Sequence, residues 1–391
     1  MIRIIFFILS PFLTFLYSCF DLRRRSSQVV FVLFFALFGY CHTFEDMRAD
    51  SYRKYGSFMH YGTVRGVEDI VDDFRDGEIK DLYEDVLFAS LRDLTDDPHI
   101  MMMAVGLFGG FFYMLVMKRF AMDRRMRYTL PIVILLMFML MESNIPLMGG
   151  IRNFSAFPLF IYSLIRVFID NRKWWIVGLL ITPLIHFGYI VAVVAALIIW
   201  LIRIPNVVLH YIAVVACVLS IFMDTSSYGA AVEVFVDTVD NEAIEGRVSS
   251  YGDVDTDEHF NQSLTTRLTR VNNQLSALFV ALFLVYVRRN RGSLRSTEYE
   301  QRIYKVMLFF IFVSFALISF SVVGQRFVYI AMVLMYFYML NLYQQNPRSA
   351  VRGFICAMPV VCFLHIAWTV YNCYCNVGID IFYMPLPFLL L

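Results

Sequence analysis

The chain lacks the short motifs with which soluble enzymes hold nucleotides, metals or catalytic nucleophiles. No GxSxG, P-loop, HExxH or protein-kinase signature occurs in the 391 residues, and no GxGxxG with strand patterning after it. The polar connections on the basic side of the chain are short, so no soluble catalytic domain is expected there. These absences argue against nucleotide-fold enzymes and against cytoplasmic nucleotide-sugar chemistry, and we expect no nucleic-acid partner.

Cysteine is absent from both acidic segments of the chain, residues 44–98 and 224–270. A disulfide framework is therefore not expected, and the cysteines are interpreted as buried apolar residues. All seven lie in or beside apolar runs: Cys19, Cys41, Cys217, Cys356, Cys362, Cys373 and Cys375.

The acidic run 253–258 superficially suggests a calcium site, but it lacks the glycine and the final glutamate of an EF-hand loop. Its acidic residues are Asp253, Asp255, Asp257 and Glu258. An EF-hand loop needs both that glycine and that glutamate. We predict no metal site and no cofactor.

Charged residues are scarce, at 17% of the chain, whereas 59% of the residues are hydrophobic and the mean hydropathy is +0.64. Such a composition excludes a soluble globular domain and predicts an all-α polytopic membrane protein, with residues 1–391 forming a single integral membrane domain. We expect about 12 membrane-spanning helices of roughly 17–25 residues. The predicted spans are 2–20, 28–43, 99–117, 129–147, 151–169, 174–187, 189–203, 207–223, 271–287, 304–323, 326–344 and 353–372.

Two of these spans, 174–187 and 189–203, are short, and Pro183 and Gly188 favour a break between them. Broken helices at membrane depth are tolerated where they line a cavity or are covered by protein. This pair is therefore a candidate part of a site.

The net charge is only +1, but the charges are distributed unevenly. Residues 44–98 contain fifteen Asp/Glu and seven Lys/Arg, and residues 224–270 contain ten and three. The other basic residues gather in short connections near 23–25, 118–127, 172–173, 288–302 and 348–352. The positive-inside rule places these in the cytoplasm and both acidic segments outside, provided that 174–203 crosses twice. The first apolar run is alternatively a secretory signal.

The two outer segments differ in pattern. Residues 44–98 carry apolar residues at three- and four-residue steps, which predicts amphipathic helix. Residues 224–270 have no apolar period, which is typical of a solvated loop or of a lid over a site. The glycine pairs at 109–110 and 149–150 predict close helix packing.

Several ionisable residues fall on the outer half of the predicted membrane. Arginine presents paired donors that match phosphate oxygens, so a cluster of arginines facing outward suits an anion. An arginine at such a position more often reaches the interface or pairs with a carboxylate such as Glu142 than binds a ligand, and a lone histidine is more often structural. The candidates are Arg152, Arg326, His186, Arg48, Arg53, Arg267 and Arg270.

The stretches "DMRADSYRKY", "DLYEDVL", "LTDDPHI", "GGIRNFSAFPLFIYSL", "LIHFGYIVAV" and "GQRFVYI" occur in this order over most of the chain. In this order and spacing the chain resembles bacterial polysaccharide polymerases of the O-antigen polymerase (Wzy-like) type, in particular the EpsG-like branch. It departs from that branch in the first loop, where "RADSY" stands in place of a "GtDy"-like element.

The resemblance implies a metal-independent membrane glycosyltransferase with a GT-C-like architecture in the bacterial inner membrane. Its site would face the periplasm and would transfer a growing glycan from undecaprenyl diphosphate to an incoming lipid-linked repeat unit. Arg152 and Arg326 would bind the diphosphate, His186 would act as base or orienting group, and Arg48, Arg53, Arg267 and Arg270 would make secondary contacts. The implied partners are the lipid-linked oligosaccharide, the lipid bilayer, a flippase and a chain-length regulator.

Two other functions are compatible with the same residues. A transporter or flippase of lipid-linked oligosaccharide also needs cations at membrane depth, but typically shows an internal repeat, and neither "IRNF" nor "LIHF" recurs. An outer-face ligase or acyltransferase would share the arginines and the histidine, and differs from a polymerase in the length of its product.

Overall fold

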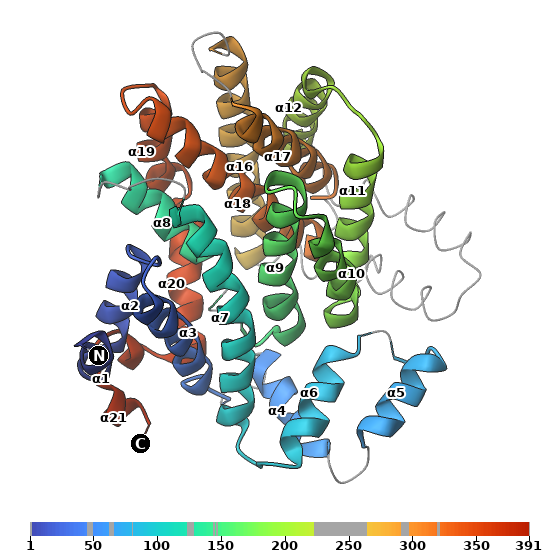
Figure 1. Cartoon of the computed structure of the whole chain (residues 1–391), viewed down its shortest axis with the longest axis vertical. Helices are drawn as coiled ribbons and strands as arrows, with labels where there is room; N and C mark the ends of the chain where they lie inside the picture. The colour runs from blue at the N-terminus through green and yellow to red at the C-terminus, as the bar shows by residue number, and fades with distance from the viewer. Residues whose placement is uncertain are drawn as a thin grey trace. The chain divides into compact units, whose positions relative to one another are not determined.

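The computed structural model describes residues 2–44, 50–61, 66–79, 81–122, 129–143, 145, 148–222, 264–290, 297–318 and 321–390. Every regular element within these ranges is a helix (Figure 1). The all-α class predicted from the sequence is therefore confirmed for the described part of the chain.

The chain divides into two compact units, one made of residues 1–193 and 367–391 and the other of residues 194–366. The single integral membrane domain predicted for residues 1–391 stays a prediction. The first unit contains α1 (Ile2–Leu9), α2 (Pro11–Cys19), α3 (Arg25–Tyr40), α4 (Asp50–His60), α5 (Val67–Arg75), α6 (Tyr83–Arg92), α7 (Pro98–Met122), α8 (Leu130–Glu142), α9 (Ile151–Leu164), α10 (Ile176–Ile185) and α21 (Leu386–Leu389).

The second unit contains α12 (Asn206–Phe222), α16 (Leu264–Arg289), α17 (Glu298–Ala316), α18 (Ser321–Gln345) and α19 (Val351–Val361). Two helices, α11 (Tyr189–Leu201) and α20 (Phe363–Val377), run across a boundary between the units.

Among the described residues, three helices are long and apolar enough to cross a membrane: Pro98–Phe120, Arg270–Arg289 and Arg326–Gln345. A fourth crossing results if α19 and α20, bent by 52° at their junction, form one span. Five shorter apolar helices, of 10–17 residues, accompany them. The model is thus compatible with a polytopic membrane protein, while the number of about 12 spans stays a prediction.

Some predicted bounds differ from those of the observed helices, besides the span 353–372, which is divided between α19 and α20. Residues 2–20 form two helices, α1 and α2, because Pro11 lacks a backbone N–H and starts a new helix after Ser10, whose φ of −154° and ψ of 89° are not helical. The helix α16 begins at Leu264, inside the segment predicted as a loop over 224–270. Residues 264–270 contain neither Gly nor Pro, so nothing in their sequence stops the helix there.

The break predicted near Pro183 and Gly188 is confirmed as the interval between α10 and α11. The helix α10 continues through Pro183 and ends at Ile185, and His186 takes an extended conformation with φ −150° and ψ 109°. The next helix starts at Tyr189.

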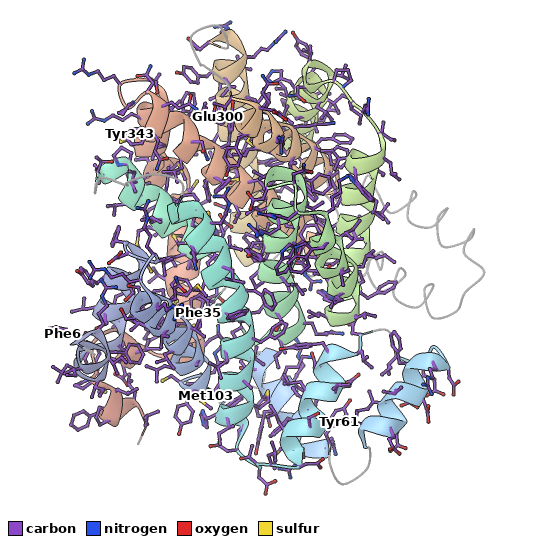
Figure 2. All side chains as sticks on the ribbon, in the orientation of Figure 1. Phe6, Phe35, Tyr61, Met103, Glu300 and Tyr343 are labelled. Carbon is purple, nitrogen blue, oxygen red and sulfur yellow. The ribbon has the colours of Figure 1, made fainter. Side chains whose placement is uncertain are left out.

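The close helix packing predicted at the glycine pair 109–110 is also confirmed, and the structure shows that it joins α7 to α3. A Cβ atom at Gly110 would lie 2.4 Å from the Cβ of Phe35, and one at Gly109 would lie 2.3 Å from the ring of Phe154 in α9. Phe35 is fully buried in α3 (Figure 2). Only a residue without a side chain allows these helices to approach so closely.

The acidic segment 44–98 folds, over its described residues, into α4, α5 and α6, so its predicted helical character is confirmed. Helix α6 has Glu84 and Asp85 in its first turn and Arg92 in its last, an arrangement that the helix dipole favours. It contacts α4, α5, α9 and α10 and lies beside the ends of α9 and α10 (Figure 1).

All seven cysteines are free. The prediction that all of them are buried is wrong, because Cys41, Cys356 and Cys373 are half-buried and Cys375 is exposed. The acidic run 253–258 lies outside the described residues, as does most of the segment 224–270.

Candidate functional site

Arg152 stands in the first turn of α9 and is held by two carboxylates. Its Nη1 donates to Asp81, and its Nε lies 3.4 Å from Oε2 of Glu84. About a third of the side chain, 34%, is exposed. The guanidinium carries five N–H donors, and no hydrogen bond to the described residues uses its Nη2.

Asp81 joins the start of α9 to the break between α10 and α11. Its side chain is 4% exposed, and its Oδ1 accepts a hydrogen bond of 2.6 Å from the backbone N–H of Phe187. The next residue, Leu82, donates its backbone N–H to the carbonyl of Leu184 over 2.9 Å. One buried carboxylate therefore fixes Arg152 and the residue that follows His186.

Glu84 connects the same network to α4. Its Oε1 accepts from the Nζ of Lys54, and the residue is 7% exposed. Two cations thus alternate with two carboxylates, in the order Lys54, Glu84, Arg152 and Asp81, and the formal charges cancel. Pairing and hydrogen bonds stabilise buried charges. Asp81 and Oε1 of Glu84 accept hydrogen bonds, whereas Oε2 of Glu84 pairs with Arg152 without a hydrogen bond among the described residues. We call these four residues the outer network.

Further polar contacts surround the outer network. The hydroxyl of Ser155 donates to the Tyr83 oxygen over 3.1 Å, and Tyr189 donates to Oδ1 of Asn153 over 3.3 Å. Burial raises the pKa of Tyr83 to about 12, so this hydroxyl stays protonated at physiological pH. The ring of His186, 8% exposed, lies 5.9 Å from the ring of Tyr189.

The structure brings some of the predicted site residues together. Arg152 and His186, which are 34 positions apart, are connected through Asp81 and the N–H of Phe187. Arg53 lies on α4 next to Lys54 and is exposed.

The other predicted residues do not belong to the outer network. Arg267 and Arg270 are exposed in the first turns of α16, and Arg326 is half-buried in α18, all in the second unit. Arg48 lies outside the described residues. Glu142, considered as a partner for Arg152, is buried at the end of α8, and Arg152 pairs with Asp81 and Glu84 instead.

A family model for EpsG, described as the EpsG family, matches residues 85–379, well over half of the chain. The chain belongs to the EpsG family. This confirms the resemblance found in the sequence and indicates a polysaccharide polymerase role in exopolysaccharide or O-antigen biosynthesis. No curated protein and no solved structure matches the chain.

In this EpsG-family chain the matched segment contains Arg152, His186 and Arg326. The outer network extends beyond it, because Lys54, Asp81 and Glu84 precede residue 85.

The sequence analysis did not identify Lys54, Asp81 or Glu84 as site residues. A signal was present, since Glu84 and Phe88 share one face of α6, Phe88 is fully buried, and Asp81 comes just before that helix. Acidic residues on or just before the face of a buried phenylalanine indicate carboxylates that need a cationic partner. The partner itself cannot be read locally, because Arg152 is 71 residues away from Asp81.

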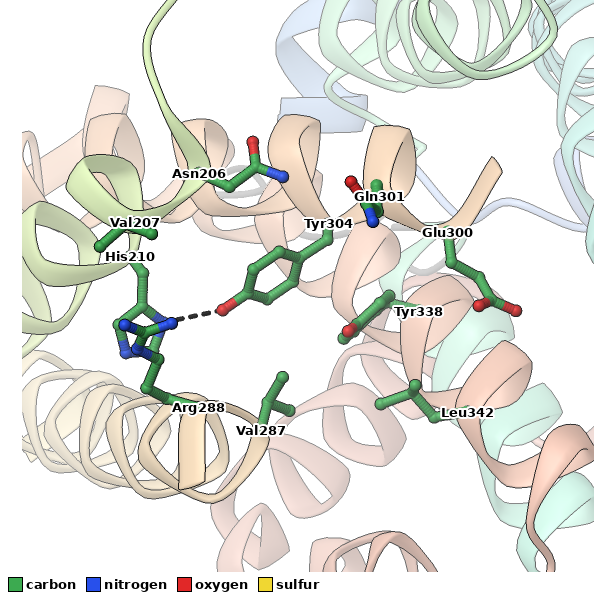
Figure 3. Close-up of a pocket in the computed structure, with 10 residues that line it drawn as sticks. All are labelled: Asn206, Val207, His210, Val287, Arg288, Glu300, Gln301, Tyr304, Tyr338 and Leu342. Carbon is green, nitrogen blue, oxygen red and sulfur yellow. Dashed lines mark hydrogen bonds between the residues drawn. The ribbon is translucent and has the colours of Figure 1, made fainter. Parts of the chain in front are cut away.

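A pocket in the second unit of the EpsG-family chain contains none of the predicted site residues. It is lined by residues of α12, α16, α17 and α18, and His210 Nδ1 lies 2.8 Å from the hydroxyl of Tyr304 (Figure 3). Arg288, at the basic end of α16, also lines it. The candidate catalytic residues are therefore not associated with this pocket.

Proposed function

We propose that this EpsG-family protein extends a glycan carried on a polyprenyl diphosphate at the outer face of the bacterial inner membrane. The observation that carries the proposal is the outer network, which holds a partly exposed arginine beside a broken helix that contains a histidine. Family membership supplies the class of reaction. The basic connections elsewhere in the chain support the outward orientation of this end.

Arg152 is the proposed ligand of the donor diphosphate. Asp81 and Glu84 occupy Nη1 and Nε, so Nη2 is left to donate to a phosphate oxygen. Lys54, whose side chain is 20% exposed, places a second positive charge beside the same carboxylate. Preorganised cations of this kind stabilise the negative charge that develops on a leaving diphosphate.

The proposed step is a single glycosyl transfer. An acceptor hydroxyl oxygen bonds to the anomeric carbon of the donor, while the bond from that carbon to the diphosphate oxygen breaks and its electron pair leaves with the diphosphate. The hydroxyl proton passes to His186, because the imidazole side chain is the residue that enzymes use most often as a general base.

Asp81 is a positioning residue in this scheme. It holds the N–H of Phe187, directly after His186, and therefore fixes the backbone that carries the histidine. Arg326 is retained as a diphosphate ligand on sequence grounds, and Arg48, Arg53, Arg267 and Arg270 as secondary contacts. The proposed transfer uses the cationic side chains of the protein. The proposed partners of the protein are the lipid-linked oligosaccharide, the bilayer, a flippase and a chain-length regulator.

The test is gel analysis of surface glycan in cells that carry the native biosynthetic locus and a variant in place of the wild-type gene. The variants are Arg152→Ala, Arg326→Ala and His186→Ala, each checked for membrane expression. Arg75→Ala and His60→Ala are matched controls, because both residues are exposed on α5 and α4. Arg152→Lys keeps the charge but not the paired donors, and separates loss of charge from loss of geometry.

A polymerase predicts that the ladder collapses to a single repeat unit while lipid-linked units still reach the outer face, with both controls unchanged. A ladder that persists in all three variants refutes the proposed roles. Accumulation of lipid-linked units on the inner face would instead identify a transporter. Full-length chains that are made but not transferred to their final acceptor would identify a ligase.

A further inference from the structure

The end of α9 opposite Arg152 carries a second charge cluster with a different balance. Helix α9 continues into a π-helical turn, Ile165–Ile169, and Asp170 follows it. Arg119 of α7 donates to Asp170 from Nη2 over 2.7 Å and from Nε over 3.1 Å, and Arg166 donates from Nη1 over 2.7 Å. The Asp170 side chain is 8% exposed. Two guanidinium groups therefore share one buried carboxylate and leave one positive charge.

A tight turn adds two more cations at this end. The backbone N–H of Arg172 donates to the carbonyl of Arg166 over 2.7 Å, and Asn171 has a φ of 57°. This turn presents Arg172 and Lys173, both exposed, directly beyond Asp170. Four basic side chains thus accompany a single acidic one.

Aromatic rings cover one side of the cluster. The Arg166 guanidinium lies 5.8 Å from the centre of the Tyr162 ring, and Trp175 packs edge-on against the same ring at 4.7 Å. Trp174 is 64% exposed. Tryptophan and tyrosine are enriched where a membrane meets water, so this end of the helices has the composition of an interface. Within the described residues, the buried Nε of Arg166 has no partner.

An apolar stripe leads away from the cluster along α10. Val177, Leu180, Ile181 and Leu184 follow at helical spacing on one face and are exposed by 40% to 55%. The stripe begins three residues after Trp174. An anion that carries acyl chains would therefore contact the basic residues with its headgroup and the apolar face of α10 with its chains. A soluble anion would contact only the basic residues.

We propose that Arg166, Arg172, Lys173 and Trp174 form a binding site for the phosphate headgroup of an anionic glycerophospholipid. Basic pockets between membrane helices on the cytoplasmic side recognise such headgroups, and the positive-inside rule places this end of α9 there. Nineteen residues, from Ile151 to Ile169, separate it from the outer network, which is roughly 28 Å along a helix. The site is therefore distinct from the proposed catalytic site.

The test measures lipid binding to the full-length protein purified in a neutral detergent. Native mass spectrometry compares phosphatidylglycerol with phosphatidylcholine, and inorganic phosphate is titrated separately. The test variant is Arg172→Gln with Lys173→Gln, which leaves the Asp170 ion pairs intact. The matched control is Arg348→Gln with Arg352→Gln, which removes two exposed positive charges from another basic connection.

We expect the test variant to bind phosphatidylglycerol roughly twenty-five times more weakly, because each of the two basic residues at an anionic headgroup contributes about a fivefold effect. The control should retain wild-type affinity. Trp174→Ser, with Arg172 and Lys173 kept, should also weaken binding of the lipid.

Equal losses in the test and control variants would overturn the proposal, since they would reveal a general charge effect. Equal affinity for phosphatidylcholine would also overturn it, and so would inorganic phosphate that competes fully with the lipid. The readout is binding rather than activity, so its outcome is independent of the proposed polymerase reaction.

Discussion

The ion pair between Asp81 and Arg152 is expected to stabilise the fold, and a double-mutant cycle measures it. Asp81→Asn keeps the size of the side chain but removes its charge, so the guanidinium loses one of its two carboxylate partners. The amide also weakens the charge-assisted hydrogen bond from Phe187. Both effects act at a residue that is 4% exposed.

The magnitude follows from burial and from the remaining contacts. Removing one partner of a fully buried ion pair costs about 3–5 kcal/mol. Arg152 is 34% exposed and keeps Glu84, so solvent and the second carboxylate offset part of that cost. We expect Asp81→Asn to lower the free energy of unfolding by about 2 kcal/mol, and the coupling energy with Arg152→Gln to be about 1–2 kcal/mol.

The assay is reversible unfolding in mixed micelles of a neutral detergent and dodecyl sulfate, followed by tryptophan fluorescence for the wild type, both single variants and the double variant. Asp93→Asn serves as the control, because it makes the same chemical change at an exposed residue at the other end of α6. The control should change stability by less than about 0.5 kcal/mol. Additive effects of the two single substitutions would refute the pairing.

Three further outcomes are expected. Lys54→Met should lower stability in the same assay by about 1–2 kcal/mol, because it leaves a buried carboxylate of α6 with one cation fewer, whereas Lys54→Arg should retain most of it. Gly110→Leu should lower stability by about 1–3 kcal/mol, since a Cβ there would lie 2.4 Å from a side chain of α3, whereas Gly353→Leu, with nothing within 4 Å, should have little effect. A maleimide applied to the folded protein should modify Cys375, which is exposed, much faster than Cys19, which is buried, as mass spectrometry of labelled peptides would show.

Composition and local pattern were sufficient to predict the features that depend on neighbouring residues. Apolar content predicted the helical class, and Pro183 with Gly188 predicted the break, although the helix continues through the proline and ends at Ile185. Pro11 was overlooked as a helix start within 2–20. In each case the deciding residue lies within a few positions of the feature that it controls.

The candidate site was predicted only in part, because several of its residues are brought in by contacts between distant segments. Arg152 and His186 were found as polar residues in apolar surroundings. Asp81 and Glu84 were not, because fifteen acidic residues in the segment 44–98 make any two of them inconspicuous. The packing of α6 against α9 decides which of these carboxylates are buried. A local sequence pattern does not show this packing.

The two ends of α9 differ in the balance of their charges, and this difference constrains what each end can bind. The outer network pairs two cations with two carboxylates, so an anion that approaches Arg152 meets a neutral group and gains mainly from the unused Nη2 donor. Affinity for a diphosphate must then come partly from the rest of the ligand, such as its sugars and its polyprenyl chain. The other end of α9 has four cations for one carboxylate, so it attracts anions by charge alone. Binding of the donor should therefore depend weakly on salt, and binding of the phospholipid strongly.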